Sequence, residues 1–268
     1  MRLVHTKQVV EYTRKKTMFD LIIPDIHGRT FWKKAIKKTA EKDIDKIVFL
    51  GDYLDPYPFE KISTNKAIEN FKEILEFADT HDNVVLLLGN HDIHYFYNPC
   101  ESGRKDIEHK EIIRELFMKN WDLFNVAHCE GVINDKADHI LYSHAGITNG
   151  YANTLEKIGL LDREHFDPYL FVKDINDAVM DKDNPLHSKA MQSLAYVSFY
   201  RGGDCLNGSL VWADICEHSQ SDPVFPKVFQ LHGHTYVKKP VVFSWNIDLD
   251  TGGTAYLLNK DDGQVTSA

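Results

Sequence analysis

The sequence has little cysteine and no long apolar run. Its 268 residues include four cysteines, at positions 100, 129, 205 and 216, and no two of them form a CxxC pair. This spacing argues against a thiolate zinc site and against a disulfide scaffold. No apolar run approaches the roughly 18 residues of a membrane span, and the N-terminus lacks the apolar core of a signal peptide. We therefore expect a protein of the reducing cytoplasm that does not associate with membranes.

The chain also lacks an excess of positive charge. Its formal net charge is −9, which makes nucleic acid a disfavoured partner because like charges repel, although a metal site reverses the sign of the field locally. Repeats, linkers and low-complexity tracts are absent as well. Because the predicted strands are spread evenly along the chain, we expect one domain over residues 1–268.

The first third of the chain repeats one pattern, in which an apolar run ends in a polar cluster with glycine. The runs and clusters are residues 18–24 before Asp25-Ile26-His27-Gly28, residues 46–50 before Gly51-Asp52-Tyr53-Leu54-Asp55, and residues 83–88 before Gly89-Asn90-His91-Asp92. Apolar residues at helical spacing follow the first two clusters, over residues 31–41 and 64–79. Alternating strands and helices predict a parallel sheet, and ligands bind beyond the carboxyl ends of such strands.

Two similar clusters follow in the second half. Residues 138–142 lead into Ser143-His144-Ala145-Gly146, and residues 227–232 lead into Gly233-His234-Thr235. After the last cluster, we expect residues 241–249 and 254–259 to pair as strands joined by a turn at residues 251–253. All five clusters are therefore predicted to lie at strand ends.

The five clusters together offer a mixed set of oxygen and imidazole ligands. Its members are Asp25, His27, Asp52, Asn90, His144 and His234. Without thiolates, such a set suits Mn, Fe or Zn. Six ligands are too many for one ion with an open position, but they fit two ions if one carboxylate is shared. We predict two divalent metal ions, with Asp52 as the bridge between them.

Paired metal ions predict hydrolytic chemistry. Two ions about 3.5–4 Å apart can hold a water or hydroxide between them and bind the oxygens of a phosphoryl group. A lone Asp-x-His after a strand is usually a helix cap with a surface histidine, and the SHAG and GHT clusters alone are weak signals. The conjunction of five clusters, all at strand ends, favours a metal-dependent phosphoesterase.

The five motifs resemble those of the calcineurin-like metallophosphoesterase superfamily. They read PDIHG, GDYLD, GNHD, YSHAG and HGHT and lie between residues 21 and 253. The resemblance implies an α/β fold, a four-layer α/β/β/α sandwich of two mixed sheets with a dinuclear site at one edge. It also implies that one metal ion takes Asp25, His27 and Asp52, and that the other takes Asp52 with the remaining three ligands.

The GDYLD motif looks closest to the serine/threonine protein phosphatase and dinucleoside polyphosphatase branch. In that branch the second aspartate orients the histidine of the GNHE motif. The resemblance therefore implies that Asp55 holds His91 and that His91 protonates the leaving oxygen. An alkoxide leaves poorly, and a histidinium kept charged by a carboxylate can supply the proton.

The chain departs from that branch directly after Asp55. Pro56 and Tyr57 stand where the branch has Arg-Gly, so the arginine that grips the phosphate is missing. Our first candidate for this substrate-binding role is Arg201, and the second is Arg29. Arginine suits the role because its planar fork matches two phosphate oxygens.

Three functions remain open. The favoured one is a phosphomonoesterase acting on a phosphoprotein or a small phosphorylated metabolite. The first alternative is a nucleotide or dinucleoside polyphosphate hydrolase, in which aromatic residues near Tyr53 and Tyr95 recognise the base. The second is a catalytically silent metal-binding interaction module, which the retention of every ligand disfavours. A nuclease is also disfavoured, because Tyr236 stands where many nucleases carry the second histidine of GHxH.

Overall fold

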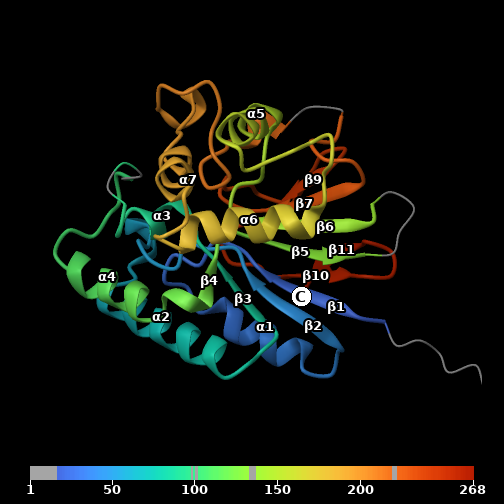
Figure 1. The fold of residues 1–268 in the computed structure, drawn as a ribbon. Coiled ribbons are helices and arrows are strands. Elements are labelled where there is room, and N and C mark those ends of the chain that lie inside the picture. The colour runs from blue at the N-terminus through green and yellow to red at the C-terminus, as the bar shows by residue number, and fades with distance from the viewer. Residues whose placement is uncertain (1–16, 98, 100–101, 133–136, 219–221) are drawn as a thin grey trace, which may run out of the picture.

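Two stacked β-sheets with helices outside them make up the described part of the chain (Figure 1). The computed structural model describes residues 17–97, 99, 102–132, 137–218 and 222–268. Cys100 and the N-terminal segment, on which the expectation of no signal peptide rests, lie outside these residues. No helix in the described ranges is long and apolar enough to cross a membrane.

The first sheet has six strands in the order β11-β10-β1-β2-β3-β4. They are β1 (Phe19–Ile23), β2 (Ile44–Phe49), β3 (Val84–Leu87), β4 (Phe124–Asn125), β10 (Tyr256–Asn259) and β11 (Val265–Ser267). Strands β1 to β4 run parallel, whereas β10 and β11 are antiparallel strands at one edge. The carboxyl ends of β1, β2 and β3 carry the first three polar clusters, as the sequence predicted.

The second sheet has five strands in the order β5-β6-β7-β9-β8. They are β5 (Ala127–Gly131), β6 (His139–Ser143), β7 (Val228–His232), β8 (Val241–Val242) and β9 (Asn246–Asp248). Strands β6, β7 and β9 run parallel, and β5 and β8 flank them antiparallel. Because β6 and β7 are parallel neighbours, the clusters that follow them lie side by side.

Helices cover the outer faces of both sheets. The helices of the described residues are α1 (Phe31–Thr39), α2 (Thr64–Asp79), α3 (Asn90–Ile93), α4 (Lys110–Lys119), α5 (Asn149–Ile158), α6 (Pro168–Met180) and α7 (His187–Leu194), with short 3-10 helices η1 (Pro58–Glu60), η3 (Trp121–Leu123), η4 (Phe199–Arg201) and η5 (Ile215–His218). In Figure 1, α1 and α2 lie below the first sheet and α5 lies above the second. The predicted four-layer α/β/β/α sandwich of two mixed sheets is therefore confirmed.

Alternation along the strands divides their side chains between two cores. Ile22 on β1 and Val48 on β2 pack in the core between the sheets, together with Leu231 on β7. Their neighbours Leu21 and Ile23 belong to the other core, which the helices complete. Since both faces of a strand are buried, its sequence reads as a continuous apolar run instead of an alternating one.

The expected pairing of residues 241–249 with residues 254–259 is wrong. Strands β8 and β9 pair with each other in the second sheet, whereas β10 pairs with β1 in the first. The segment around Gly252 thus carries the chain from one sheet to the other. In its observed place, β10 buries Tyr256 and Leu258 in the core between the sheets. Alternation predicts a strand but not the sheet edge to which that strand adds.

A buried hydrogen bond links the two sheets, and we expect its removal to destabilise the fold. The hydroxyl of Tyr142 on β6 donates to Asp20 Oδ2 on β1 at 2.6 Å, and both residues are fully buried. In Tyr142→Phe a buried carboxylate loses a donor, so the free energy of unfolding should fall by about 1–3 kcal/mol. Urea unfolding should show a lower midpoint with an unchanged slope. The exposed Tyr200 provides the control, and equal midpoints for Tyr142→Phe and Tyr200→Phe would contradict this role.

Candidate metal centre

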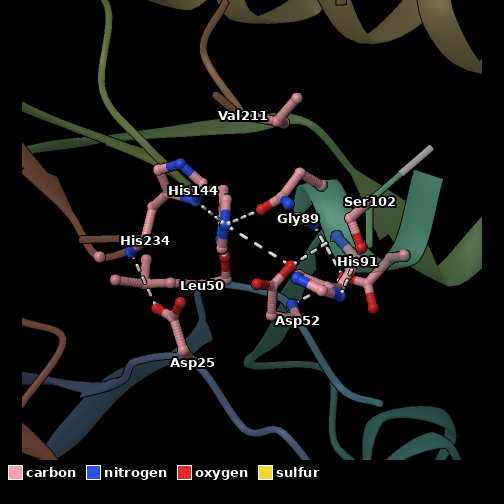
Figure 2. A network of polar contacts seen from close by, with 12 residues as sticks. Asp25, Leu50, Asp52, Gly89, His91, Ser102, His144, Val211 and His234 are labelled. Carbon is pink, nitrogen blue, oxygen red and sulfur yellow. Dashed lines mark hydrogen bonds and ion pairs between the residues drawn. The ribbon is translucent and has the colours of Figure 1, made fainter. Parts of the chain in front are cut away.

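The loops that follow five strands converge on one site, where Asp25, Asp52, His144 and His234 lie close together (Figure 2). Six predicted ligands meet there, namely Asp25 after β1, His27 after β1, Asp52 after β2, Asn90 after β3, His144 after β6 and His234 after β7. Side chains from both sheets thus come together although the chain separates them by up to 209 residues, as in the contact between His234 and Asp25. The structure brings together every residue that the sequence predicted as a ligand.

Asp52 lies between two groups of potential ligand atoms. One group is Asp25, His27 and Asp52, and the other is Asp52, His144 and His234; within each group the atoms lie no more than 4.8 Å apart. Asp52 Oδ2 is 3.5 Å from His27 Nε2, and Asp52 Oδ1 is 3.5 Å from His144 Nε2. The two carboxylate oxygens thus face different groups, which is the arrangement that a bridging ligand requires.

Backbone carbonyls fix the tautomers of two of these histidines. His27 Nδ1 donates to the carbonyl of Leu54 at 2.9 Å, and His144 Nδ1 donates to the carbonyl of Leu50 at 2.8 Å. Each neutral ring therefore carries its lone pair on Nε2, the nitrogen that faces Asp52. Such a hydrogen bond from the far nitrogen is the usual support of a metal-binding histidine.

Several polar atoms surround His144 Nε2. Asn90 Oδ1 and His234 Nδ1 each lie 3.1 Å from it, and Asp52 Oδ1 lies 3.5 Å away (Figure 2). Within the described residues, the buried His234 Nε2 has no hydrogen-bond partner. The lone pair of His144 Nε2 repels those of the Asn90 and Asp52 oxygens, and a cation between them would convert this repulsion into coordination. The donor set therefore fits metal ions.

The electrostatics of the site also fit cations. Burial lowers the pKa of His27 to about 3, so this ring is neutral at physiological pH, as a metal ligand must be. Burial raises the pKa of Asp25, and burial together with the charge of Asp25 raises the pKa of Asp250 to about 8. Burial acts in the same direction on Asp52, but the neighbouring histidines outweigh it and hold its pKa below the ordinary value. Buried carboxylates this close together are stabilised by positive charge.

The backbone at the strand ends is unusual. His27, Asp52 and His234 all have positive φ, with values of 43°, 53° and 74°. Left-handed conformations at non-glycine residues cost free energy and concentrate at functional sites. A Cβ at Gly89 would collide with the Asp52 carboxylate and the His144 ring, so only glycine lets the backbone pass this close.

Asp92, the last residue of GNHD, ties the second and third loops together. Its Oδ2 accepts from the backbone N–H of Asp52 at 2.7 Å and of Gly89 at 2.8 Å, and its Oδ1 accepts from Tyr53 N–H at 2.9 Å. These bonds fix the backbone on which Asp52 and Asn90 stand. Asp92 is thus a positioning residue that belongs to neither ligand group.

His91 and Asp55 form the predicted pair. His91 Nδ1 donates to Asp55 Oδ2 at 2.8 Å, and both residues are buried. The sequence did not predict two further partners of Asp55: His94 Nε2 lies 2.9 Å from the same oxygen, and the hydroxyl of Tyr95 donates to the other. Burial acts to raise the pKa of Asp55, but the bonds from His91 and His94 bring it down to about 2. The spacing of His91 and His94, one helical turn apart after β3, was the available signal.

The two predicted phosphate-binding arginines differ in position. Arg201 lines a pocket of about 420 Å³ together with His91 and His234. Its NH2 donates to the carbonyl of His234 at 3.1 Å and to Thr235 Oγ1 at 2.8 Å, and its Nε lies 3.0 Å from Asp214 Oδ2. These partners hold Arg201 at the pocket wall.

Arg29 is held by other contacts, and its guanidinium lies 5.5 Å from the centroid of the Tyr57 ring. Its Nε pairs with Glu60 Oε1 at 2.6 Å, and its NH1 donates to the carbonyl of Asp25 at 3.2 Å. Arg29 is not among the residues that line the pocket. Its contacts are those of a residue that ties the β1 loop to η1.

Arg104 is a pocket residue that the sequence analysis missed. Its NH1 donates to the carbonyl of Asp55 at 2.5 Å, and its NH2 lies 3.0 Å from His91 Nε2 and 3.4 Å from His27 Nε2. The guanidinium lies over the ring of Tyr57, 3.8 Å from its centroid. Arg104 follows no strand and belongs to no motif, so only its contacts identify it.

The aromatic residues considered as a base-binding wall differ in burial and in whether they line the pocket. Tyr53 and Tyr95 are buried, whereas Phe59 is largely exposed. Tyr57 lines the pocket, but its ring contacts Arg104 and stacks on Phe59. Packing therefore accounts for most of this group.

Comparisons with solved structures found distant likenesses. The solved structures to which the chain is similar include a protein serine/threonine phosphatase from Saccharomyces cerevisiae with similarity to human phosphatase PP5. That match has 14% identity and a TM-score of 0.48, and it covers 96% of this chain and 80% of that one. Another is a protein assigned as a diadenosine tetraphosphatase, at 13% identity and a TM-score of 0.41, covering 93% of this chain and 92% of that one. Likenesses this distant carry no information about substrate.

The sequence comparisons give a more definite result. No curated protein sequence matches the chain. Residues 21–238, however, match the family model of the calcineurin-like phosphoesterases, and this segment contains all five motifs. With the match covering most of its length, the chain belongs to the calcineurin-like phosphoesterase family of metal-dependent hydrolases.

Proposed function

We propose that this protein hydrolyses phosphate monoesters at a dinuclear metal site bridged by Asp52. The observation that carries the proposal is the placement of the two Asp52 oxygens, each 3.5 Å from a histidine of a different ligand group. Asp25 and His27 would hold one ion, and Asn90, His144 and His234 would hold the other. When bound, the ions supply a hydroxide nucleophile near neutral pH and neutralise charge on the phosphoryl group.

In this proposal His91 is the general acid. Its Nδ1 is held by Asp55, so that its Nε2 faces the pocket beside Arg104. A histidinium stabilised by a buried carboxylate can give its Nε2 proton to the leaving alkoxide. The bond from the His91 backbone N–H to Asp52 Oδ1, at 2.9 Å, supports the placement of this acid beside the metal ligands.

The occupied face of Tyr57 favours a monoesterase over a dinucleoside polyphosphate hydrolase. A base needs an open aromatic face on which to stack. The Tyr57 ring instead carries the Arg104 guanidinium at 3.8 Å and stacks on Phe59 with centroids 5.3 Å apart. We therefore take the substrate to be a phosphoprotein or a small phosphorylated metabolite.

Metal removal combined with a substrate screen tests this function. We expect a chelator to abolish hydrolysis of p-nitrophenyl phosphate and Mn to restore it, because the nucleophile needs the ions. Metal content, measured by elemental analysis, should recover with activity. Hydrolysis that survives complete metal removal would refute the mechanism. A preference of about tenfold or more for a dinucleoside polyphosphate over phosphomonoesters would remove the monoesterase assignment.

A further inference from the structure

We propose that Arg104, held on the ring of Tyr57, is the residue that binds the phosphoryl oxygens of the substrate. This inference rests on the proposed function and names the residue that replaces the arginine absent after Asp55. Arg104 comes from the loop before α4, far from that position in the sequence. The role would therefore be filled from a different part of the chain.

The guanidinium of Arg104 lies close to a ligand group and to the proposed general acid. Its NH2 lies 3.4 Å from His27 Nε2, an atom placed to bind metal, and 3.0 Å from His91 Nε2, the atom placed to donate the proton. These are the two chemical centres between which the phosphoester must lie. No other arginine that lines the pocket has such contacts.

Arg104 and His91 meet at one point of the pocket. The NH2 group of Arg104 lies 3.0 Å from His91 Nε2, and both residues line the same pocket. A phosphoryl oxygen at that point would lie within reach of the guanidinium, and hydrogen bonds between charged partners of this kind are the strong ones.

No carboxylate among the described residues neutralises the positive charge of Arg104, so this charge can pair with a bound anion. Within the described residues Arg104 makes no ion pair with a carboxylate, whereas Arg201 pairs with Asp214 and Arg29 pairs with Glu60. Its NH1 is bound only to a neutral carbonyl, that of Asp55. A guanidinium beside two divalent cations would be repelled unless an anion lay between them. A phosphate dianion meets that requirement.

Tyr57 provides the platform that keeps Arg104 in this position. The guanidinium lies 3.8 Å from the ring centroid, within the range of a cation–π contact. Phe59, which belongs to η1, stacks on the same ring. Pro56-Tyr57 thus replaces Arg-Gly with a support for an arginine supplied by another loop.

Binding of inorganic phosphate to the Mn-loaded protein tests this role directly. By calorimetry, Arg104→Ala should weaken phosphate binding about 10- to 100-fold, the range for a lost hydrogen bond between charged groups. Arg104→Lys should recover only part of the loss, because a point charge lacks the fork. Metal content should stay at the wild-type value in both variants. Arg114→Ala, on the exposed side of α4, is the matched control and should bind phosphate normally.

Tyr57 variants separate the platform from simple packing. Tyr57→Phe keeps the ring and should bind phosphate as the wild type does. Tyr57→Leu removes the ring and should weaken binding about 3- to 30-fold, the scale of a cation–π contact. In the kinetics of p-nitrophenyl phosphate, these losses should appear in KM as well as in kcat, because the contact exists with bound substrate.

The outcomes distinguish this inference from the proposed function. If Arg104→Ala binds phosphate as tightly as the wild type while the wild type hydrolyses monoesters, the role of Arg104 is refuted and the function stands. If Arg104→Ala loses metal, Arg104 supports the ligand loops instead, which also refutes the inference. A wild-type protein that binds Mn and phosphate but hydrolyses no phosphate ester refutes the function and leaves the binding site in place.

Discussion

Asp52→Asn is expected to lose metal from both ligand groups and to retain almost no hydrolytic activity. Asp52 is the one residue shared by the two groups, with one oxygen facing His27 and the other facing His144. An amide has a single oxygen acceptor and no charge, so it cannot bridge two cations. Loss of an outer-shell partner of a metal ligand already weakens metal affinity by roughly 10- to 100-fold. Loss of the bridge should exceed that range.

The substitution is well suited to the test because asparagine fits the site. Asp52 has a φ of 53°, a left-handed conformation that asparagine adopts more readily than most residues. In the wild type, the backbone N–H of His91 donates to Asp52 Oδ1 at 2.9 Å, and the amide oxygen of asparagine can still accept this bond. The thermal stability of the metal-free variant should therefore be close to that of the metal-free wild type.

Asp20→Asn provides the matched control. Asp20 is also fully buried, but it lies on β1 before the strand reaches the site, where it accepts from Tyr142. This variant should lose stability and keep its metal ions. Elemental analysis decides the matter, since two ions per chain in Asp52→Asn would show that Asp52 does not bridge.

His91→Asn is expected to keep its metal ions and to hydrolyse alkyl phosphates about 100-fold or more slowly, the scale of one general acid. His91 contributes no atom to the two ligand groups that contain Asp52, so metal content should not change. Its imidazole bonds to Asp55 and faces the pocket, and asparagine cannot deliver a proton from that position. The measurement is kcat on an alkyl ester such as O-phosphoserine, with metal content determined on the same sample.

The leaving group provides an internal check on the role of His91. p-Nitrophenolate is a stable anion and departs without a proton, so its ester should be affected much less than the alkyl ester. His128→Asn is the control, because His128 pairs with Glu130 at 2.9 Å in the same manner but outside the site. Equal losses on both esters would indicate disturbed positioning, and full-speed hydrolysis of the alkyl ester would rule out His91 as the acid.

Much of the fold was predictable because its signals are local. Residues 64–79 were predicted as a helix and form α2 over the same range, with Ser63 accepting from Lys66 N–H at its start. The runs before Asp25, Asp52 and Asn90 were predicted as strands because they are apolar on both faces. The partner of β10 was not predictable, since an alternating strand fits any open sheet edge.

The partners of Asp55 could be predicted from sequence motifs only in part. His91 was predicted from its motif, but His94 and Tyr95 were not recognised as further partners of the same carboxylate. Arg104 has no motif at all, and its place over Tyr57 depends on a loop between α3 and α4. Such contacts join residues about 40 to 50 positions apart, for which no spacing rule exists.

The sequence by itself determined which side chains could hold metal, because each ligand stands at the end of a strand in a short cluster with glycine. Parallel strands place their carboxyl ends at one edge, so the convergence of Asp25, Asp52 and Asn90 followed from the order of the elements. Only the tertiary structure decided how the second sheet presents His144 and His234 to that edge, and that Arg104 joins Arg201 in the pocket lining. Both depend on packing between distant segments, in which the free energy of burying apolar surface fixes positions that no local pattern encodes.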